Sequence, residues 1–286
     1  MKNVTDAPMS GIAKMYRGIT VPLRLLPDFL IIGTQRGGTT SLYNYLTARP
    51  GVGPAAVKEL RFFDRKFHKG TLWYRAHFPT RMQKNYFERT HKQIFVTGEA
   101  STNYLFYPHT PKRVAQVVPD VKLIVLLRNP VDRAYSHYKF EVEHRQETLS
   151  FEDALAFEEE RTRKEREKIL ADEKYVSVAH SRYSYLVRGI YVDQLEAWMK
   201  FFPREQFLIL KSEAFYTDPV TTLEQVSEFL TVPQLAPHGG TKGYKQYNHT
   251  SNTQMDTATR KRLIEYFEPH NARLYDLLGV NLGWNR

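Results

Sequence analysis

The sequence predicts an α/β fold: a single domain with a central parallel sheet and helices on both faces. Apolar runs of strand length alternate along the chain with longer segments of helical periodicity. The first apolar run passes directly into a turn rich in glycine and hydroxyl side chains, and a helical pattern follows, which is the order of a strand–loop–helix unit. A chain of 286 residues is long enough to bury the core of one such domain.

Four strands are expected from continuous apolar runs, which are typical of strands covered on both faces. They are Phe29–Ile32, Ile94–Thr97, Leu123–Leu127 and Phe207–Leu210. Helices are expected where apolar residues recur at helical spacing. These segments are Ser41–Thr47, Pro111–Val117, Val131–His144, Phe151–Lys174, Leu186–Phe201, Pro219–Phe229 and Thr257–Leu278. Ligands of such sheets bind at the carboxyl ends of the strands, which here carry Arg36, Glu99, Arg128 and Lys211.

Two further segments stand out along the chain. Residues 158–168 are dense in charges of both signs at i,i+4 spacing, which favours a solvated helix face over a docking surface for a partner. Pro237–Asn252 contains glycines and lysines and has no periodicity, so it is predicted to be a mobile loop that covers a ligand.

Composition narrows the class of function. The net charge is +10, but the basic residues fall in short clusters without interleaved aromatics, so nucleic acid is not an expected partner. No apolar run approaches the ~18 residues of a membrane span, and no signal-peptide core precedes the domain. The chain has no cysteine, and its ten histidines show no metal-binding spacing, so no metal is expected. These features predict a cytoplasmic protein.

The turn after the first strand, Gly33–Ser41, reads as an anion cradle. Gly37 and Gly38 let backbone N–H groups face a ligand, and the following helix N-terminus favours negative charge. Three hydroxyl side chains at its end add donors. They are Thr39, Thr40 and Ser41.

The nucleotide-triphosphate pattern G-x-x-x-x-G-K-[ST] fits this turn imperfectly. Thr39 stands where that pattern requires lysine, and Arg128 ends the third strand where a magnesium-binding aspartate would be expected. The cation of the turn is instead Arg36. A metal-free, arginine-rich nucleotide site is therefore favoured over a P-loop small-molecule kinase, which remains the alternative enzyme class.

Five segments in order give the chain a resemblance to the sulfotransferases that use 3′-phosphoadenosine 5′-phosphosulfate (PAPS). It looks most like the branch containing the heparan sulfate N- and 3-O-sulfotransferase domains and their bacterial relatives. The segments are Gly33–Ser41, Lys58–Asp64, Arg128–Tyr138, Thr241–Tyr244 and Tyr266–Tyr275. The resemblance implies the P-loop-kinase-like sulfotransferase fold, with residues 27–286 as the sulfotransferase domain and residues 1–26 as an N-terminal extension.

The resemblance also implies how the donor is bound. PAPS would be the cofactor, PAP (3′-phosphoadenosine 5′-phosphate) the product, and no metal would take part. In the family, the residues matching Arg128 and Ser136 hold the 3′-phosphate. The 5′-phosphosulfate would lie on Arg36, Gly37, Gly38, Thr39, Thr40 and Ser41, and a closing loop would bring Lys242, Tyr244 and Lys245.

Glu59 is the candidate general base. Sulfuryl transfer to a hydroxyl requires a group that accepts its proton, and in the resembling family the matching glutamate is the proposed base. Lys58, Arg61 and Asp64 would order its surroundings. The alternative interpretation is a loop ion pair between Glu59 and Lys58.

Three positions depart from the family pattern and bear on the acceptor. The family usually has lysine at the position of Arg36, and glycan-sulfating members tend to have histidine at Arg61 and lysine at Ala100. Weak or no sulfation of heparan-type polymers is therefore expected. A smaller hydroxyl-bearing acceptor, such as a carbohydrate, a hydroxyacyl chain or a metabolite, is predicted. Its pocket is expected to have aromatic walls from Phe62, Phe63, Tyr104 and Phe106.

Two alternatives remain open at this point. A degenerate sulfotransferase fold could bind nucleotide or glycan as a non-catalytic adaptor. The chain could also be a truncated lumenal domain, in which case the Golgi lumen replaces the cytoplasm. The oligomeric state is not predicted.

Overall fold

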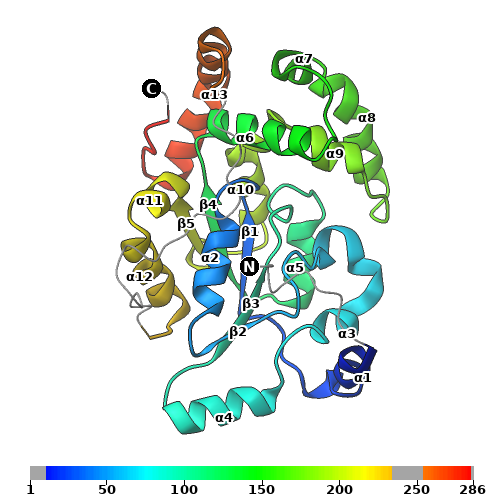
Figure 1. Ribbon diagram of the computed structural model, residues 1–286, viewed down its shortest axis with the longest axis vertical. Coiled ribbons are helices and arrows are strands. Elements are labelled where there is room, and N and C mark those ends of the chain that lie inside the picture. Colours follow the sequence, from blue (N-terminus) through cyan, green and yellow to red (C-terminus); the bar gives the residue numbers. More distant parts are fainter. Residues whose placement is uncertain (1–10, 234–253, 285–286) are drawn as a thin grey trace.

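The computed structural model describes residues 11–233 and 254–284 and contains a five-stranded parallel sheet (Figure 1). Its strands are β1 (Phe29–Gly33), β2 (Val52–Pro54), β3 (Val96–Ala100), β4 (Lys122–Leu127) and β5 (Phe207–Lys211). Their spatial order is β2-β3-β1-β4-β5, and every neighbouring pair is parallel. The predicted α/β class and parallel sheet are therefore confirmed.

Alternate residues of the central strands point to opposite faces of the sheet, and each face buries its own core. On β1, Phe29 and Ile31 pack in one cluster, whereas Leu30 and Ile32 pack in the other. The first cluster is covered by α2 (Thr39–Thr47), α11 (Ser212–Thr217) and α12 (Pro219–Leu230). The second is covered by α5 (Thr110–Val117), α6 (Pro130–Glu143), α10 (Tyr191–Met199) and α13 (Thr257–Leu278). Helices on both faces bear out the predicted layers.

The remaining elements flank this three-layer centre. At the bottom of Figure 1 lie α1 (Gly11–Ile19), α3 (Gly70–Arg75) and α4 (Arg81–His91); at its upper right lie α7 (Phe151–Ala156), α8 (Glu158–Ala171) and α9 (Val178–Tyr183). Short turns complete the chain. They are η1 (Val21–Leu23), η2 (Phe62–Lys66), η3 (Phe67–Lys69), η4 (Val187–Gly189) and η5 (Arg204–Gln206).

Several boundaries differ from the sequence prediction. The helix expected over residues 151–174 is two helices, α7 and α8. Glu158, at the junction, is buried and accepts the N–H groups of Leu186 (2.6 Å) and Val187 (3.0 Å). That tertiary contact, invisible in the periodicity, turns the start of α8 inward. The predicted segment 186–201 likewise begins with the turn η4, and the helix α10 starts only at Tyr191.

Strand β2 and the helices α1, α3, α4, α9 and α11 were not predicted. Strand β2 contains glycine and proline and has no strand signature, and it forms at the sheet edge by pairing Val52 with Val96. Helix α4 is highly polar, but Thr80 and Gln83 form a capping box at its start, which satisfies backbone donors there. The predicted loop Pro237–Asn252 lies outside the described residues.

Candidate functional site

The turn between β1 and α2 is shaped by its glycines. Gly38 is the N-cap of α2 and has a φ of 94°. Residues that carry a side chain rarely adopt this backbone conformation. A Cβ on Gly37 would lie 2.8 Å from the carbonyl oxygen of Leu126, so only glycine lets the turn pack this closely on β4. The turn is also held by the Thr34 N–H, which donates to the same Leu126 oxygen at 2.9 Å.

Two arginines meet at this turn. Arg128, which follows β4, donates from Nη1 to the carbonyl oxygen of Arg36 at 3.0 Å. The side chain of Arg36 donates from Nε to Ser136 Oγ of α6 at 3.0 Å, and its guanidinium lies 5.1 Å from the ring centroid of Phe140. Burial, followed by the positive charge of Arg128, lowers the pKa of Arg36. Two like charges this close repel, and an anion between them would relieve that repulsion.

The structure therefore brings the predicted donor-binding residues together. Arg36, Arg128 and Ser136 come from three segments of the chain and converge on the N-terminus of α2, whose first turn holds the three hydroxyl residues. One detail differs from the expected division of labour. Ser136, assigned to the 3′-phosphate, contacts Arg36, which was assigned to the 5′ end. The remaining donor-site candidates, Lys242, Tyr244 and Lys245, lie outside the described residues.

Glu59 sits on the loop that crosses the carboxyl end of β3. Its backbone N–H donates to the carbonyl oxygen of Ala100 at 3.0 Å. Its carboxylate accepts from Lys58 Nζ (3.0 Å), from the Thr102 N–H (3.2 Å) and from Thr102 Oγ1 (3.1 Å). The side chain remains 32% exposed, so it reaches solvent. The ion pair with Lys58 exists, but Thr102 also orients the carboxylate.

Arg61 and Asp64, on the same loop, form a buried network with residues from elsewhere. Arg61 Nε donates to Asp64 Oδ2 at 2.6 Å, and Asn103 Nδ2 donates to the same oxygen at 2.8 Å. Arg188 in turn donates from Nη2 to Asn103 Oδ1 at 3.0 Å. Asp64 and Arg188 are both buried, so their charges depend on these partners.

Glu99 is the acidic residue whose role the sequence did not reveal. It is fully buried in β3 and accepts from Tyr74 Oη (2.8 Å), Tyr104 Oη (2.8 Å) and Ser101 Oγ (2.7 Å). Burial raises its pKa to about 7, although the three hydrogen bonds act in the opposite direction. Ser101 Oγ also accepts the N–H of Arg61 at 3.2 Å, which links this carboxyl to the loop of Glu59.

Three of the four aromatic side chains that were expected to line the acceptor pocket do not line one. Phe62, Phe63 and Tyr104 are buried in the core, where the Phe62 and Tyr74 rings stack with centroids 4.4 Å apart. These side chains support the loop from below, so the interpretation of them as pocket walls is wrong. Phe106 is partly buried, and the guanidinium carbon of Arg188 lies 4.3 Å from the centroid of the Phe106 ring.

The loop that carries Arg36 follows β1. The loop that carries Glu59 follows β2 and crosses the carboxyl end of β3, the strand between β2 and β1. Ile31 of β1 pairs with Ala100 of β3, and the Ser101 N–H donates to the Ile31 carbonyl oxygen at 3.1 Å. Both loops therefore leave the same edge of the sheet, where ligands of parallel sheets bind. The arrangement places a cation-rich turn beside a solvent-reaching carboxylate, as a group transfer between an anionic donor and a hydroxyl requires.

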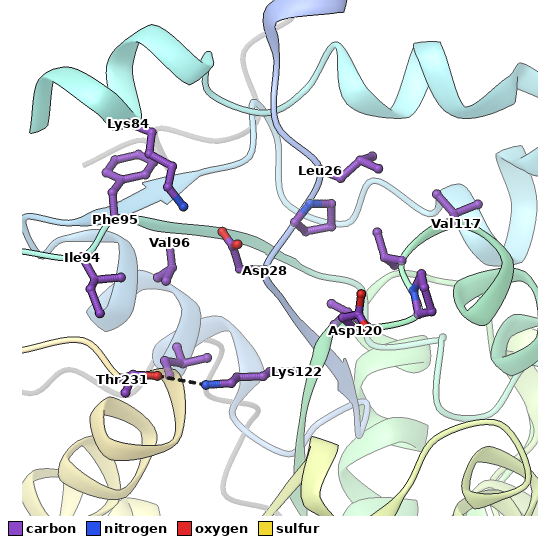
Figure 2. Close-up of a pocket in the computed structure, with 15 residues that line it drawn as sticks. Leu26, Asp28, Lys84, Ile94, Phe95, Val96, Val117, Asp120, Lys122 and Thr231 are labelled. Carbon is purple, nitrogen blue, oxygen red and sulfur yellow. Dashed lines mark hydrogen bonds between the residues drawn. The ribbon is translucent and has the colours of Figure 1, made fainter. Parts of the chain in front are cut away.

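A cavity of about 460 Å³ opens at the other edge of the sheet (Figure 2). Asp28, Val96 and Lys122, at the amino-terminal ends of β1, β3 and β4, line it, and Lys122 donates to Thr231 Oγ1 at 3.1 Å. None of the predicted site residues in the described part of the chain lines it. In residues 11–233 and 254–284, acidic and histidine side chains form no cluster suited to a metal. Nor does that part of the chain contain a helix able to cross a membrane.

Comparison with known proteins decides the family. The family model for the sulfotransferase domain matches residues 26–265. The chain belongs to the sulfotransferase family. It is 30% identical to human heparan sulfate glucosamine 3-O-sulfotransferase 3B1, over 99% of this chain and 70% of the relative. It is 32% identical to human bifunctional heparan sulfate N-deacetylase/N-sulfotransferase 3, over 88% of this chain but only 30% of the relative.

A solved sulfotransferase shares the fold. The crystal structure of the sulfotransferase from Alicyclobacillus acidocaldarius has a TM-score of 0.64 and 30% identity, covering 92% of this chain and all of that one. The resemblance drawn from five segments is therefore confirmed, as are the sulfotransferase fold and the enzyme class. A P-loop kinase is no longer needed as an alternative.

Proposed function

We propose that this sulfotransferase uses Glu59 as general base to move the sulfuryl group of PAPS onto the hydroxyl of a small or weakly anionic acceptor. The observation that carries this proposal is that the loop of Arg36 follows β1 and the loop of Glu59 crosses the carboxyl end of the neighbouring strand β3, so both lie at one sheet edge. A carboxylate that reaches solvent can accept the acceptor proton, and a guanidinium facing the donor can neutralise charge on the leaving phosphate.

The donor would lie on the cradle between β1 and α2. Its 5′-phosphosulfate would meet the backbone of residues 36–40 and the hydroxyls at the start of α2, and Arg128 and Ser136 would read the 3′-phosphate. The fit is supported by the glycine geometry, since a Cβ at Gly37 would lie 2.8 Å from the Leu126 carbonyl oxygen and Gly38 has a φ of 94°. Lys242, Tyr244 and Lys245 would close over the nucleotide. Arg36 would act by charge and hydrogen bonding, because arginine does not give up a proton.

The acceptor side would be organised by the loop of Glu59. Lys58 and Thr102 hold the carboxylate, and Asp64, which also accepts from Asn103, fixes Arg61 beside it. The relatives whose names specify heparan sulfate suggest a polyanionic acceptor, but two positions here favour a less anionic one. Ala100 is fully buried and offers no cation, and Arg61 already pairs with Asp64.

We also propose residues 27–286 as the catalytic domain and the cytoplasm as the compartment. The absence of cysteine from the whole sequence is compatible with a reducing environment. A lumenal location is the alternative, and fractionation of cells that express the chain distinguishes the two.

The donor assignment is tested by calorimetry without magnesium. PAP should bind far more tightly than ADP, because ADP lacks the 3′-phosphate that Arg128 and Ser136 would contact. Arg128→Ala should weaken PAP binding by ~1.5–3 kcal/mol, the range for a hydrogen bond to a charged group, and leave ADP binding nearly unchanged. Equal affinity of the wild type for PAP and ADP would contradict the donor site.

The acceptor assignment is tested by transfer of labelled sulfuryl groups to a panel. Small hydroxylated compounds should be sulfated faster than N-sulfated heparan fragments. Equal or faster transfer to the heparan fragments would reject the small acceptor while leaving the donor site intact.

A further inference from the structure

The basic excess of the chain is concentrated in its first third. Residues 1–94 contain 16 Lys and Arg against 5 Asp and Glu, whereas residues 95–286 contain 25 against 26. Between residues 65 and 98 the sequence has one acidic residue, Glu88, and its carboxylate lies 3.8 Å from Lys84 Nζ. The net charge of +10 therefore belongs to one part of the chain, and the donor-binding arginines explain little of it.

Two stretches of this basic part form one surface at the amino-terminal edge of the sheet. Arg17 of α1 donates to the carbonyl oxygen of Ala76 at 3.1 Å. Arg24, just after η1, donates to the carbonyl oxygen of Phe78 at 2.6 Å. These bonds tie α1 and η1 to the segment that joins α3 to α4. In Figure 1, α1 and α3 lie at the lower right and α4 lies along the bottom.

The same surface exposes large apolar side chains. Met82 and Tyr86, one helical turn apart on α4, are each 71% exposed, and Ile19 of α1 is 74% exposed. Further exposed apolar side chains lie on α1, η1 and α3, and the bonds above and the contacts of η1 with α1 and α3 bring these elements together. Such a grouping is uncommon on a surface that faces water alone. We define the docking face by its exposed apolar residues, which are Met15, Tyr16, Ile19, Leu23, Leu72, Met82 and Tyr86.

We propose that the docking face binds the surface of a membrane that contains anionic lipids. Apolar side chains inserted at the headgroup boundary, combined with surrounding lysines and arginines, are the two signals that peripheral membrane binding requires. Exposed or partly exposed basic residues on α3, on α4 and directly beside them are Lys69, Arg75, Arg81, Arg89 and Lys92.

The charge and the apolar residues of the docking face favour an anionic membrane over a second copy of the chain or a nucleic acid. A second copy of the chain would bring the same basic surface against itself, and like charges across an interface are repulsive. A nucleic acid would satisfy the lysines and arginines through its phosphates but would leave Ile19, Met82 and Tyr86 without an apolar partner. An anionic bilayer satisfies both kinds of side chain.

This orientation is compatible with sulfuryl transfer. The docking face lies at the amino-terminal ends of the strands, and the cradle at Gly37 lies at their carboxyl ends, on the opposite edge of the sheet. A docked molecule would therefore keep its donor site open to water, where PAPS is dissolved.

The test is co-sedimentation of the full chain with vesicles at low salt. One vesicle is phosphatidylcholine, and the other contains roughly a third phosphatidylserine, so that the surface is strongly anionic. We expect binding to the anionic vesicle alone, weakened by added salt. Two variants separate the contribution of apolar insertion to vesicle binding from the contribution of charge. They are Met82→Ser/Tyr86→Ser for insertion and Arg81→Gln/Arg89→Gln/Lys92→Gln for charge.

Matched controls come from α8 and α9, on the other side of the molecule. Leu170→Ser/Val178→Ser removes comparably exposed apolar side chains (55% and 51%). Arg163→Gln/Lys164→Gln/Arg166→Gln removes the same number of charges from α8.

We expect the charge variant to lose roughly 100-fold in vesicle affinity, since each basic residue near an anionic surface contributes about a factor of five. The insertion variant should lose at least roughly 10-fold, and both controls should match the wild type. Unchanged PAP binding checks that each variant is folded.

Equal sedimentation with both vesicles, no sedimentation with either, or equal losses in the controls would overturn the proposal. Tighter binding to duplex DNA that the insertion variant leaves unchanged would also overturn it, in favour of a nucleic-acid surface.

Discussion

The turn at Gly37 and the loop at Glu59 lie at the same sheet edge but are held in different ways. The turn takes its shape largely from its own glycines: Gly38 adopts a positive φ without strain, and Gly37 leaves room for Leu126, although Arg36 also has a φ of 69°. In the loop, Glu59 and Arg61 have φ of 56° and 57°, although neither is glycine. Such a conformation costs of order 1 kcal/mol or more per residue and needs support from elsewhere.

That support comes from residues distant in sequence. The loop donates hydrogen bonds to Ala100 and Ser101 and accepts hydrogen bonds from Thr102. Asn103 connects Asp64 to Arg188. The difference teaches that the backbone of the donor turn is shaped largely by local sequence, even though its arginine meets Arg128 and Ser136 from distant segments. The acceptor loop depends on distant residues for its backbone shape as well. Substitutions in the turn should act on one ligand, and substitutions in the loop should act through several residues.

The largest effect is expected at Glu59. If it is the general base, Glu59→Gln should lower turnover by ~10²–10⁴ and leave PAP affinity and thermal stability near wild type. Single-turnover kinetics at saturating donor measures this, with Glu160→Gln on exposed α8 as the control. Turnover close to wild type would remove Glu59 from the chemistry and leave Asp64 as the next carboxylate to test.

The next largest effect is expected at Arg36, on the donor side. Arg36→Ala should lower turnover by ~10²–10³, the range for loss of one group that stabilises developing charge. Arg36→Lys should retain most activity, because an ammonium restores the charge. Steady-state rates for the two variants decide this. If alanine is tolerated, the backbone of the turn suffices for the donor, and the leaving-group role is wrong.

A smaller effect, on stability and pH, is expected at Glu99. Its pKa is raised to about 7 in the folded protein from an ordinary value of 4.5, so the unfolded chain releases this proton first as pH rises. The stability associated with the protonated carboxyl is fully present below about pH 4.5. It is lost as pH rises through about 7.

The Glu99→Gln variant cannot ionise at this position. Its free energy of unfolding, relative to that of the wild type, should therefore be ~1–3 kcal/mol higher at about pH 8 than at about pH 5. Urea unfolding at the two pH values measures this change, and Glu160→Gln should show none. If the variant and the wild type differ in free energy of unfolding by the same amount at both pH values, Glu99 is ionised in the folded protein throughout this range. Because Arg36 does not titrate in this range, PAP affinity should not follow the same profile.

Much of the fold could be predicted because its signals are local. Continuous apolar runs identified four of the five strands, and the glycines and hydroxyls after the first strand located the anion cradle. Residues that lay outside these signals were missed. Strand β2 forms because an edge partner is available at Val96, and α8 begins at Glu158 because distant N–H groups bind its carboxylate.

The sequence by itself determined the α/β class, the parallel sheet and the family, and it led to the proposed donor-side residues, since each depends on a short pattern of residue types. Tertiary structure alone decided the surroundings of Glu59. It placed Phe62 and Phe63 in the core instead of in a pocket, buried Glu99 beneath the loop, and joined Asp64 to Asn103 and Arg188. The physical reason is that burial and hydrogen-bond partners are properties of the packed chain. Residues far apart in sequence supply them.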